Sequence, residues 1–255
     1  MMDFAKESGH WYAIDGEPKY TIIGKNGKER NTTLRDARKE HFLPSVTTIL
    51  KVADKPALNR WKENQILLAA LTLPKVDGET VDQFAKRVQE DANQQSKDAR
   101  ELGSEIHGAI ESFFLTGRFN PEFTDEVLAT NEALTTRYGN QKWLAERSVT
   151  HSLGYGGKVD LHSADVVVDY KTKDFDENNL PKGYDEQCMQ LAAYRACINP
   201  NAECANLFVS RTNPGLVHLH EWSEDELVKG FEMFRHLLAY WKLIKSYDSS
   251  FKEAA

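Results

Sequence analysis

The sequence predicts an α/β protein with a mixed core sheet flanked by helices, to which an N-terminal β-hairpin and helices are added. Three observations lead to this fold class. β-Rich stretches cover 147–173 and 205–222, a helical pattern lies between them from about Tyr184 to Ile198, and an amphipathic helix follows Trp222. Strands and helices in this order are typical of an α/β core.

Residues 1–42 are predicted to form a β-rich arm, with short strands around the turn region Gly24–Gly27. A helical region is expected over 43–140. Ser45 is a candidate N-cap for VTTILKV, and a second helix is expected from about Pro56 to Leu71.

A third helix is expected from about Asp82 to Thr116, where Gly117 and Pro121 end the pattern. Its apolar residues recur at spacings of four, three and four, which is the period of one helix face. They are Leu102, Ile106, Ala109 and Phe113.

Residues 141–255 are predicted to form the core, in one compact unit with the rest of the chain. Its last helix begins with a capping box of Ser223 and Glu226. An apolar stripe then packs either on the core or in a dimer seam. The stripe consists of Leu227, Phe231, Phe234, Leu238 and Trp241.

The composition is that of a globular protein, with 40% hydrophobic and 28% charged residues. No apolar run reaches the roughly 20 residues that span a bilayer, and no leader pattern is present, so no membrane partner and a cytoplasmic location are expected. Three cysteines without CxxC spacing predict reduced thiols rather than a zinc or iron–sulfur site. They are Cys188, Cys197 and Cys204.

Positive charge is concentrated near the front of an acidic chain. The formal net charge is −7, yet the segment from Lys19 to Lys62 holds eleven Lys/Arg and four Asp/Glu, a net of +7. This segment either binds nucleic-acid phosphates or is an ordinary solvated face.

The stretch GGKVDLHSADVVVDYKTK carries the chemistry. Asp169 and Lys171 are two apart in an apolar strand and therefore share a face. With a two-residue Ala164–Asp165 turn, Asp160 falls opposite Asp169 and Lys158 opposite Lys171.

Two carboxylates this close repel each other, and a divalent cation relieves the repulsion. Oxygen ligands suit Mg²⁺ or Mn²⁺, and the nearby Lys171 suits a reaction in which a phosphoryl group gains negative charge. A solvated ion pair between Asp169 and Lys171 is the structural alternative.

The pattern resembles the PD-(D/E)XK nuclease superfamily in its RecB-like exonuclease branch, and is most similar to the mitochondrial genome maintenance exonucleases and their phage and bacterial relatives. The landmarks follow one another in the expected order: LPSVTTIL, RWK, GSEIHGAIESF, LAERSV, GGKVDL, VVDYKT and QLAAY. The resemblance implies a restriction-endonuclease-like sheet. No four-cysteine cluster signature and no helicase motif accompany it.

The resemblance implies a role for each matched residue. Asp160, Asp169 and His107 are then metal ligands and Lys171 is the catalytic lysine, although on its helix alone His107 reads as a core histidine. Glu146 either binds metal, directly or through water, or is a surface glutamate.

Gln190 and Tyr194 match the QxxxY element of the active site, with Gln187 as the competing glutamine; a packing helix is the alternative reading. Nucleic acid is expected at two places. Ser45, Thr47 and Thr48 either bind a phosphate or simply cap a helix, and Trp61 with Lys62, or Tyr20, holds the strand or packs on the core.

The sequence thus predicts an Mg²⁺- or Mn²⁺-dependent deoxyribonuclease that hydrolyses DNA from free ends, with single-stranded DNA as the expected substrate. The alternatives are a restriction or junction-cleaving endonuclease and a catalytically silent DNA-binding subunit. A phage-encoded enzyme of recombination or repair, with a recombination or helicase partner, fits this reading by analogy.

Overall fold

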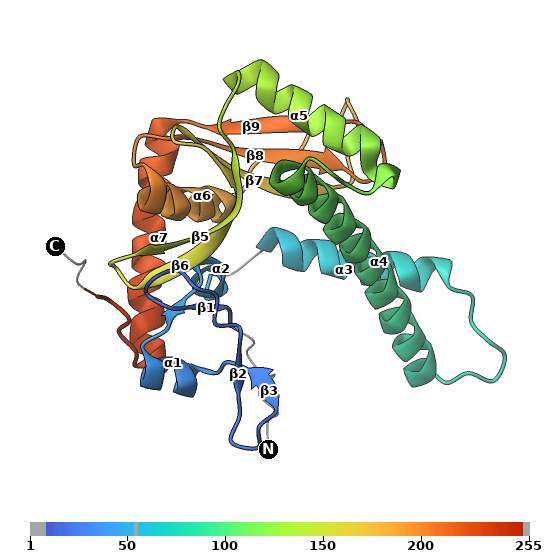
Figure 1. The fold of residues 1–255 in the computed structure, drawn as a ribbon. Coiled ribbons are helices and arrows are strands. Elements are labelled where there is room, and N and C mark those ends of the chain that lie inside the picture. Colours follow the sequence, from blue (N-terminus) through green and yellow to red (C-terminus); the bar gives the residue numbers. More distant parts are fainter. Residues whose placement is uncertain (1–8, 54–55, 252–255) are drawn as a thin grey trace.

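The computed structural model describes residues 9–53 and 56–251. A five-stranded mixed sheet, in the order β5-β6-β7-β8-β9, forms the centre of the molecule (Figure 1). Its strands are β5 (Leu144–His151), β6 (Tyr155–His162), β7 (Val166–Lys173), β8 (Glu203–Ser210) and β9 (Val217–Trp222). Only β7 and β8 are parallel. The expected α/β class is therefore confirmed.

The parallel pair is joined by α6 (Asp185–Ile198), and α7 (Glu224–Lys245) follows the last strand. Both helices cover one face of the sheet with α2 (Val46–Leu50), in a core that contains Tyr155, Leu191 and Phe234. The stripe predicted for α7 lies in this core; Leu227, Leu238 and Trp241 are at most 3% exposed. Packing on the core, rather than a dimer seam, thus accounts for the stripe.

The other face is covered by α4 (Val81–Thr116), η1 (Pro121–Phe123) and α5 (Thr124–Tyr138). Thr80 and Gln83 cap the start of α4, and Gly117 ends it in the left-handed conformation, as the glycine signal predicted. The predicted stripe is wrong at one position. Leu102 is 37% exposed, because the helix turns Ile106 and Ile110 toward the sheet instead.

The helix α3 (Pro56–Thr72) runs beside α4, and the two project away from the sheet (Figure 1). They share a small core of their own, formed by Ala69, Val88 and Ala92 with Leu73 and Phe84 packed against them.

The N-terminal arm contains the hairpin β2 (Thr21–Ile23) and β3 (Glu29–Asn31), and β1 (Trp11–Tyr12) pairs with β4 (Leu43–Pro44). The arm also contains α1 (Leu34–Glu40), a helix that the expected β-rich character of 1–42 does not include. Thr33 and Asp36 form its capping box, a signal present in the sequence.

None of the described helices combines the length and apolar character that crossing a bilayer would require.

Candidate active site

The hairpin between β6 and β7 has the predicted turn. The Ser163 amide donates to the Val166 carbonyl at 2.8 Å, and the register pairs Leu161 with Val168. Only that pair and His162 with Val167 are paired between β6 and β7, so the two strands separate beyond these residues. In the gap, the Tyr170 amide donates to Asp160 Oδ2 at 2.9 Å instead of to a strand carbonyl.

The predicted opposition of Lys158 and Lys171 is wrong, because the strands part before reaching it. Lys158 forms an ion pair with Glu146 on β5 instead. Lys171 forms one with Asp169, at 2.5 Å from Nζ to Oδ2. Each lysine therefore accompanies one carboxylate.

One group of side chains in the described part of the chain could hold a metal ion: His107 of α4, Glu146 of β5 and Asp160 of β6. One ligand atom from each lies within 4.8 Å of the others. His107 Nε2 is 3.7 Å from Asp160 Oδ2, and its ring meets Tyr170 edge to face. An imidazole with two carboxylates is a donor set that divalent cations accept.

The electrostatics fit a cation at this point. Burial raises the pKa of Asp160 well above its ordinary value, and the charge of Asp169 raises it further. Burial lowers the pKa of His107, although Asp169 and Glu146 oppose the change, which favours the neutral imidazole that a metal requires. Asp160 is therefore a carboxylate that is costly to ionise without a positive neighbour.

Glu146 also has an unusual backbone. Its φ of 54° is left-handed, although it lies within β5 and is not glycine. Such a conformation costs about 1 kcal/mol or more and is often found at functional sites.

Asp169 lies beside this group, with its oxygens already engaged. Gln190 Nε2 of α6 donates to Oδ1 at 2.9 Å, and Asn206 Nδ2 of β8 donates to Oδ2 at 2.7 Å. Burial lowers the pKa of Lys171, but Asp169 and Asp160 raise it more, so its pKa lies above the ordinary value and the ammonium is charged.

The helix α6 supplies the QxxxY pair. Gln190, rather than Gln187, contacts Asp169, since Gln187 Oε1 accepts from the Tyr184 amide at the start of the helix. The Tyr194 hydroxyl lies 3.5 Å from Gln190 Nε2. A Cβ at Gly157 would come within 2.4 Å of the Tyr194 ring, so the close approach of β6 to α6 requires glycine there.

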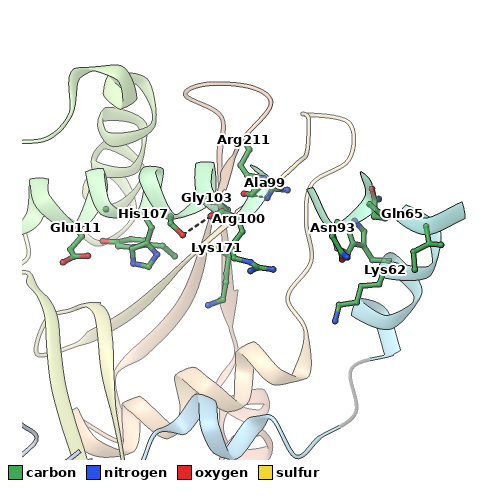
Figure 2. Close-up of a pocket in the computed structure, with 17 residues that line it drawn as sticks. Lys62, Gln65, Asn93, Ala99, Arg100, Gly103, His107, Glu111, Lys171 and Arg211 are labelled. Atoms are coloured by element: carbon green, nitrogen blue, oxygen red, sulfur yellow. Dashed lines mark hydrogen bonds between the residues drawn. The ribbon is translucent and has the colours of Figure 1, made fainter. Parts of the chain in front are cut away.

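A cavity of about 910 Å³ opens beside the site, between α4 and α3 (Figure 2). His107 lines it from α4 and Lys171 from β7, and Trp61 and Lys62 line it from α3. Arg100 and Arg211 also line the cavity. Neither was predicted, because both lie outside every motif in the sequence. Four cations line the wall against one carboxylate, that of Glu111, and this excess of positive charge suits a polyanion.

The three hydroxyl residues predicted to bind nucleic acid lie elsewhere, and none lines this cavity. Ser45 Oγ accepts from the Thr48 amide at 3.0 Å and contacts the Thr47 and Thr48 hydroxyls. Ser45 is 2% exposed, which agrees with the capping alternative. Tyr20 of the arm stacks at a tilt on His10 and shares a hydrogen bond with Tyr12.

Comparison with known proteins gives distant likenesses only. No protein-family model matches the sequence, and no curated protein does. A candidate exonuclease from Eubacterium rectale superposes with a TM-score of 0.42 at 11% identity, over 76% of this chain and 87% of that one. An alkaline exonuclease from Laribacter hongkongensis gives 0.29 at 12% identity, over 74% and 98%. Scores this low carry no conclusion about function.

Proposed function

We propose that the protein is a divalent-metal-dependent DNA exonuclease, which hydrolyses phosphodiester bonds from free ends of single-stranded DNA. One observation carries the proposal. A three-residue metal group stands next to the ion pair of buried Asp169 with half-buried Lys171, at the wall of a cavity lined by cations. The ordered motifs of the sequence support the same reading.

Each residue has a place in this chemistry. Asp160, Glu146 and His107 would hold an Mg²⁺ or Mn²⁺ ion, which supplies a Lewis acid and an activated water. Lys171 brings a fixed positive charge to the cavity wall, where it stabilises charge on the scissile phosphate. Gln190 and Asn206 hold Asp169, which in turn holds the Lys171 ammonium.

The test is the degradation of end-labelled linear single-stranded DNA with Mg²⁺, Mn²⁺ or EDTA. We expect metal-dependent loss of label with the wild type, no loss in EDTA, and intact closed circles. Lys171→Ala should lower the rate by about 10²–10³-fold, as removal of one charge-stabilising group does. Lys86→Ala on the outer part of α4 is the matched control, because Lys86 is 77% exposed and lies outside the cavity.

Two outcomes would replace the proposal. Cleavage of closed circles at the same rate indicates an endonuclease with the same site. Binding without cleavage under every metal indicates a silent DNA-binding subunit.

A further inference from the structure

A second cavity, of about 670 Å³, lies between the N-terminal arm, the end of α2 and the last turns of α7. Trp11 and Thr32 line it from the arm, Thr48 and Lys51 from the end of α2, and Lys245 from α7. None of the residues that line it, within the described part of the chain, is an aspartate or glutamate.

Two buried polar atoms in this wall have no hydrogen-bond partner among the described residues. They are Trp11 Nε1 and Thr32 Oγ1, in side chains that are 3% and 1% exposed. An indole N–H can only donate, and a hydroxyl can donate as well. A buried donor without an acceptor costs free energy, so this wall would favour a ligand rich in acceptor oxygens.

The charged residues of the wall are all positive, which matches a phosphate. Arg30 is neutralised by a two-point ion pair with Asp36, at 2.7 and 2.8 Å. Lys51 is exposed, and no carboxylate of the described residues pairs with it. The cavity thus offers a cation that no described carboxylate neutralises, next to two donors without a described partner, and this combination suits a phosphate group.

The segment that carries His10 borders the cavity, because its neighbours Gly9 and Trp11 line the wall. The His10 amide donates to Thr48 Oγ1 at 3.3 Å, and burial and then the charges of Lys51 and Lys158 lower the pKa of its ring. Lys158 is the lysine paired with Glu146. The charges of Lys51, at the cavity, and of Lys158, beside the metal group, thus both act on the His10 ring and favour its neutral form.

We propose that this cavity is a second phosphate-binding site, in which Trp11, Thr32 and Lys51 hold a phosphate of the nucleic-acid strand outside the catalytic centre. The phosphate chemistry rests on the cavity alone, whereas the choice of a strand as its source rests on the proposed function. A free mononucleotide carries the same group, and the experiment separates the two sources.

The first measurement follows the indole N–H resonances of ¹⁵N-tryptophan-labelled full-length protein during titration with inorganic phosphate and with deoxyadenosine 5′-monophosphate. Trp11→Phe assigns the signal of Trp11. We expect that signal to move, and Lys51→Glu and Thr32→Val each to weaken the response roughly tenfold, the effect of one charge-assisted contact. Lys25→Glu, with the same charge change in the exposed turn of the β2–β3 hairpin, should leave it unchanged.

The second measurement uses 5′-phosphorylated oligonucleotides of increasing length in a Lys171→Ala background, where cleavage is suppressed. Strands long enough to span both sites should move the Trp11 signal and lose roughly tenfold in affinity with Lys51→Glu, whereas the binding of shorter strands at the catalytic site should not depend on Lys51. Lys51 dependence with the mononucleotide alone supports the site and assigns it to free nucleotides.

A Trp11 signal that no phosphate ligand moves, or that moves equally with Lys51→Glu, overturns the proposal. If the wild type cuts no DNA but the Trp11 signal still responds, the proposed function fails and the phosphate site stands. The two failures are therefore distinguishable.

Discussion

Asn206 allows the most direct test of how the site is built. It is fully buried in β8, and its amide joins two groups: Nδ2 donates to Asp169 Oδ2 at 2.7 Å, and Oδ1 accepts from Trp222 Nε1 at 2.8 Å. Asn206→Ala removes both bonds. It removes one donor from Asp169, which keeps Gln190 and Lys171, and it leaves the Trp222 indole without its acceptor.

The cost follows from these two losses. A hydrogen bond to a charged group contributes about 1.5–3 kcal/mol, and a buried indole left unsatisfied costs about 1–3 kcal/mol. Because the two share one side chain they do not add fully, and we expect the free energy of unfolding to fall by about 3–4 kcal/mol. Activity should fall by about 10–100-fold at saturating metal, since Asp169 and Lys171 lose their support.

The assays are urea unfolding followed by circular dichroism and the rate of DNA degradation. Asn201→Ala, an exposed asparagine just before the same strand, is the control and should change the stability by less than about 0.5 kcal/mol. An Asn206→Ala protein within about 1 kcal/mol of the wild type and with undiminished activity would refute the argument.

Asn206→Asp tests how the destabilisation depends on pH. A carboxylate placed against Asp169 raises the pKa of the pair above that of the unfolded chain, so the destabilisation is present at high pH. It should diminish as the pH falls through the raised pKa, because a protonated carboxyl can again donate to Asp169. The destabilisation of Asn206→Ala should show no such recovery.

Two further predictions concern other parts of the molecule. In Gly103→Ala the new Cβ would lie 2.4 Å from Thr172 Oγ1. The overlap costs about 1–3 kcal/mol against a helix gain of about 1 kcal/mol, and it pushes α4 with His107 off β7. DNA degradation should fall in the single variant and recover in Gly103→Ala/Thr172→Ala; undiminished activity of the single variant would contradict this. Burial raises the pKa of all three cysteine thiols to about 12, so their thiolate fraction at pH 8 is roughly a thousandfold below that of an ordinary thiol. Iodoacetamide should label the native protein slowly at pH 8 and faster as the pH rises, and rapid labelling at pH 8 would disprove the burial argument.

Local patterns predicted the parts of the fold that local physics decides. The apolar run before Asp169 fixed β7, and the short turn at Ala164–Asp165 fixed the register of the hairpin. The cap at Ser45 and the capping box at Ser223 marked helix starts that the structure confirms. The free state of the cysteines was predicted as well.

The rest depends on contacts between distant segments. Pairing within one hairpin cannot reveal that Gln190 and Asn206 occupy the oxygens of Asp169, or that Glu146 joins His107 and Asp160. Asn206 did carry a signal, since it is a lone amide in an apolar strand. Arg100 and Arg211 carried none, because only the docking of α4 on the sheet brings them together.

The polar side chains of the site come from four adjacent strands of the sheet, β5 to β8. Glu146 and Asp160 lie between the pairs Ala145–Leu161 and Arg147–Val159, and Asp169 lies beside Asn206. Asp160 of β6 is joined to β7 through the Tyr170 amide, next to Asp169. Because side chains alternate between the two faces of a sheet, a slip of one residue in any of these strands would turn its polar side chain to the opposite face.

The site therefore forms only when all of these strands pair in the correct register. A chain whose strands are mispaired by one position still buries apolar surface, but it assembles no metal group and no Asp169–Lys171 pair. We accordingly expect insertions and deletions to be tolerated in surface loops away from the cavity, and to abolish the site when they fall inside one of the strands that carry it.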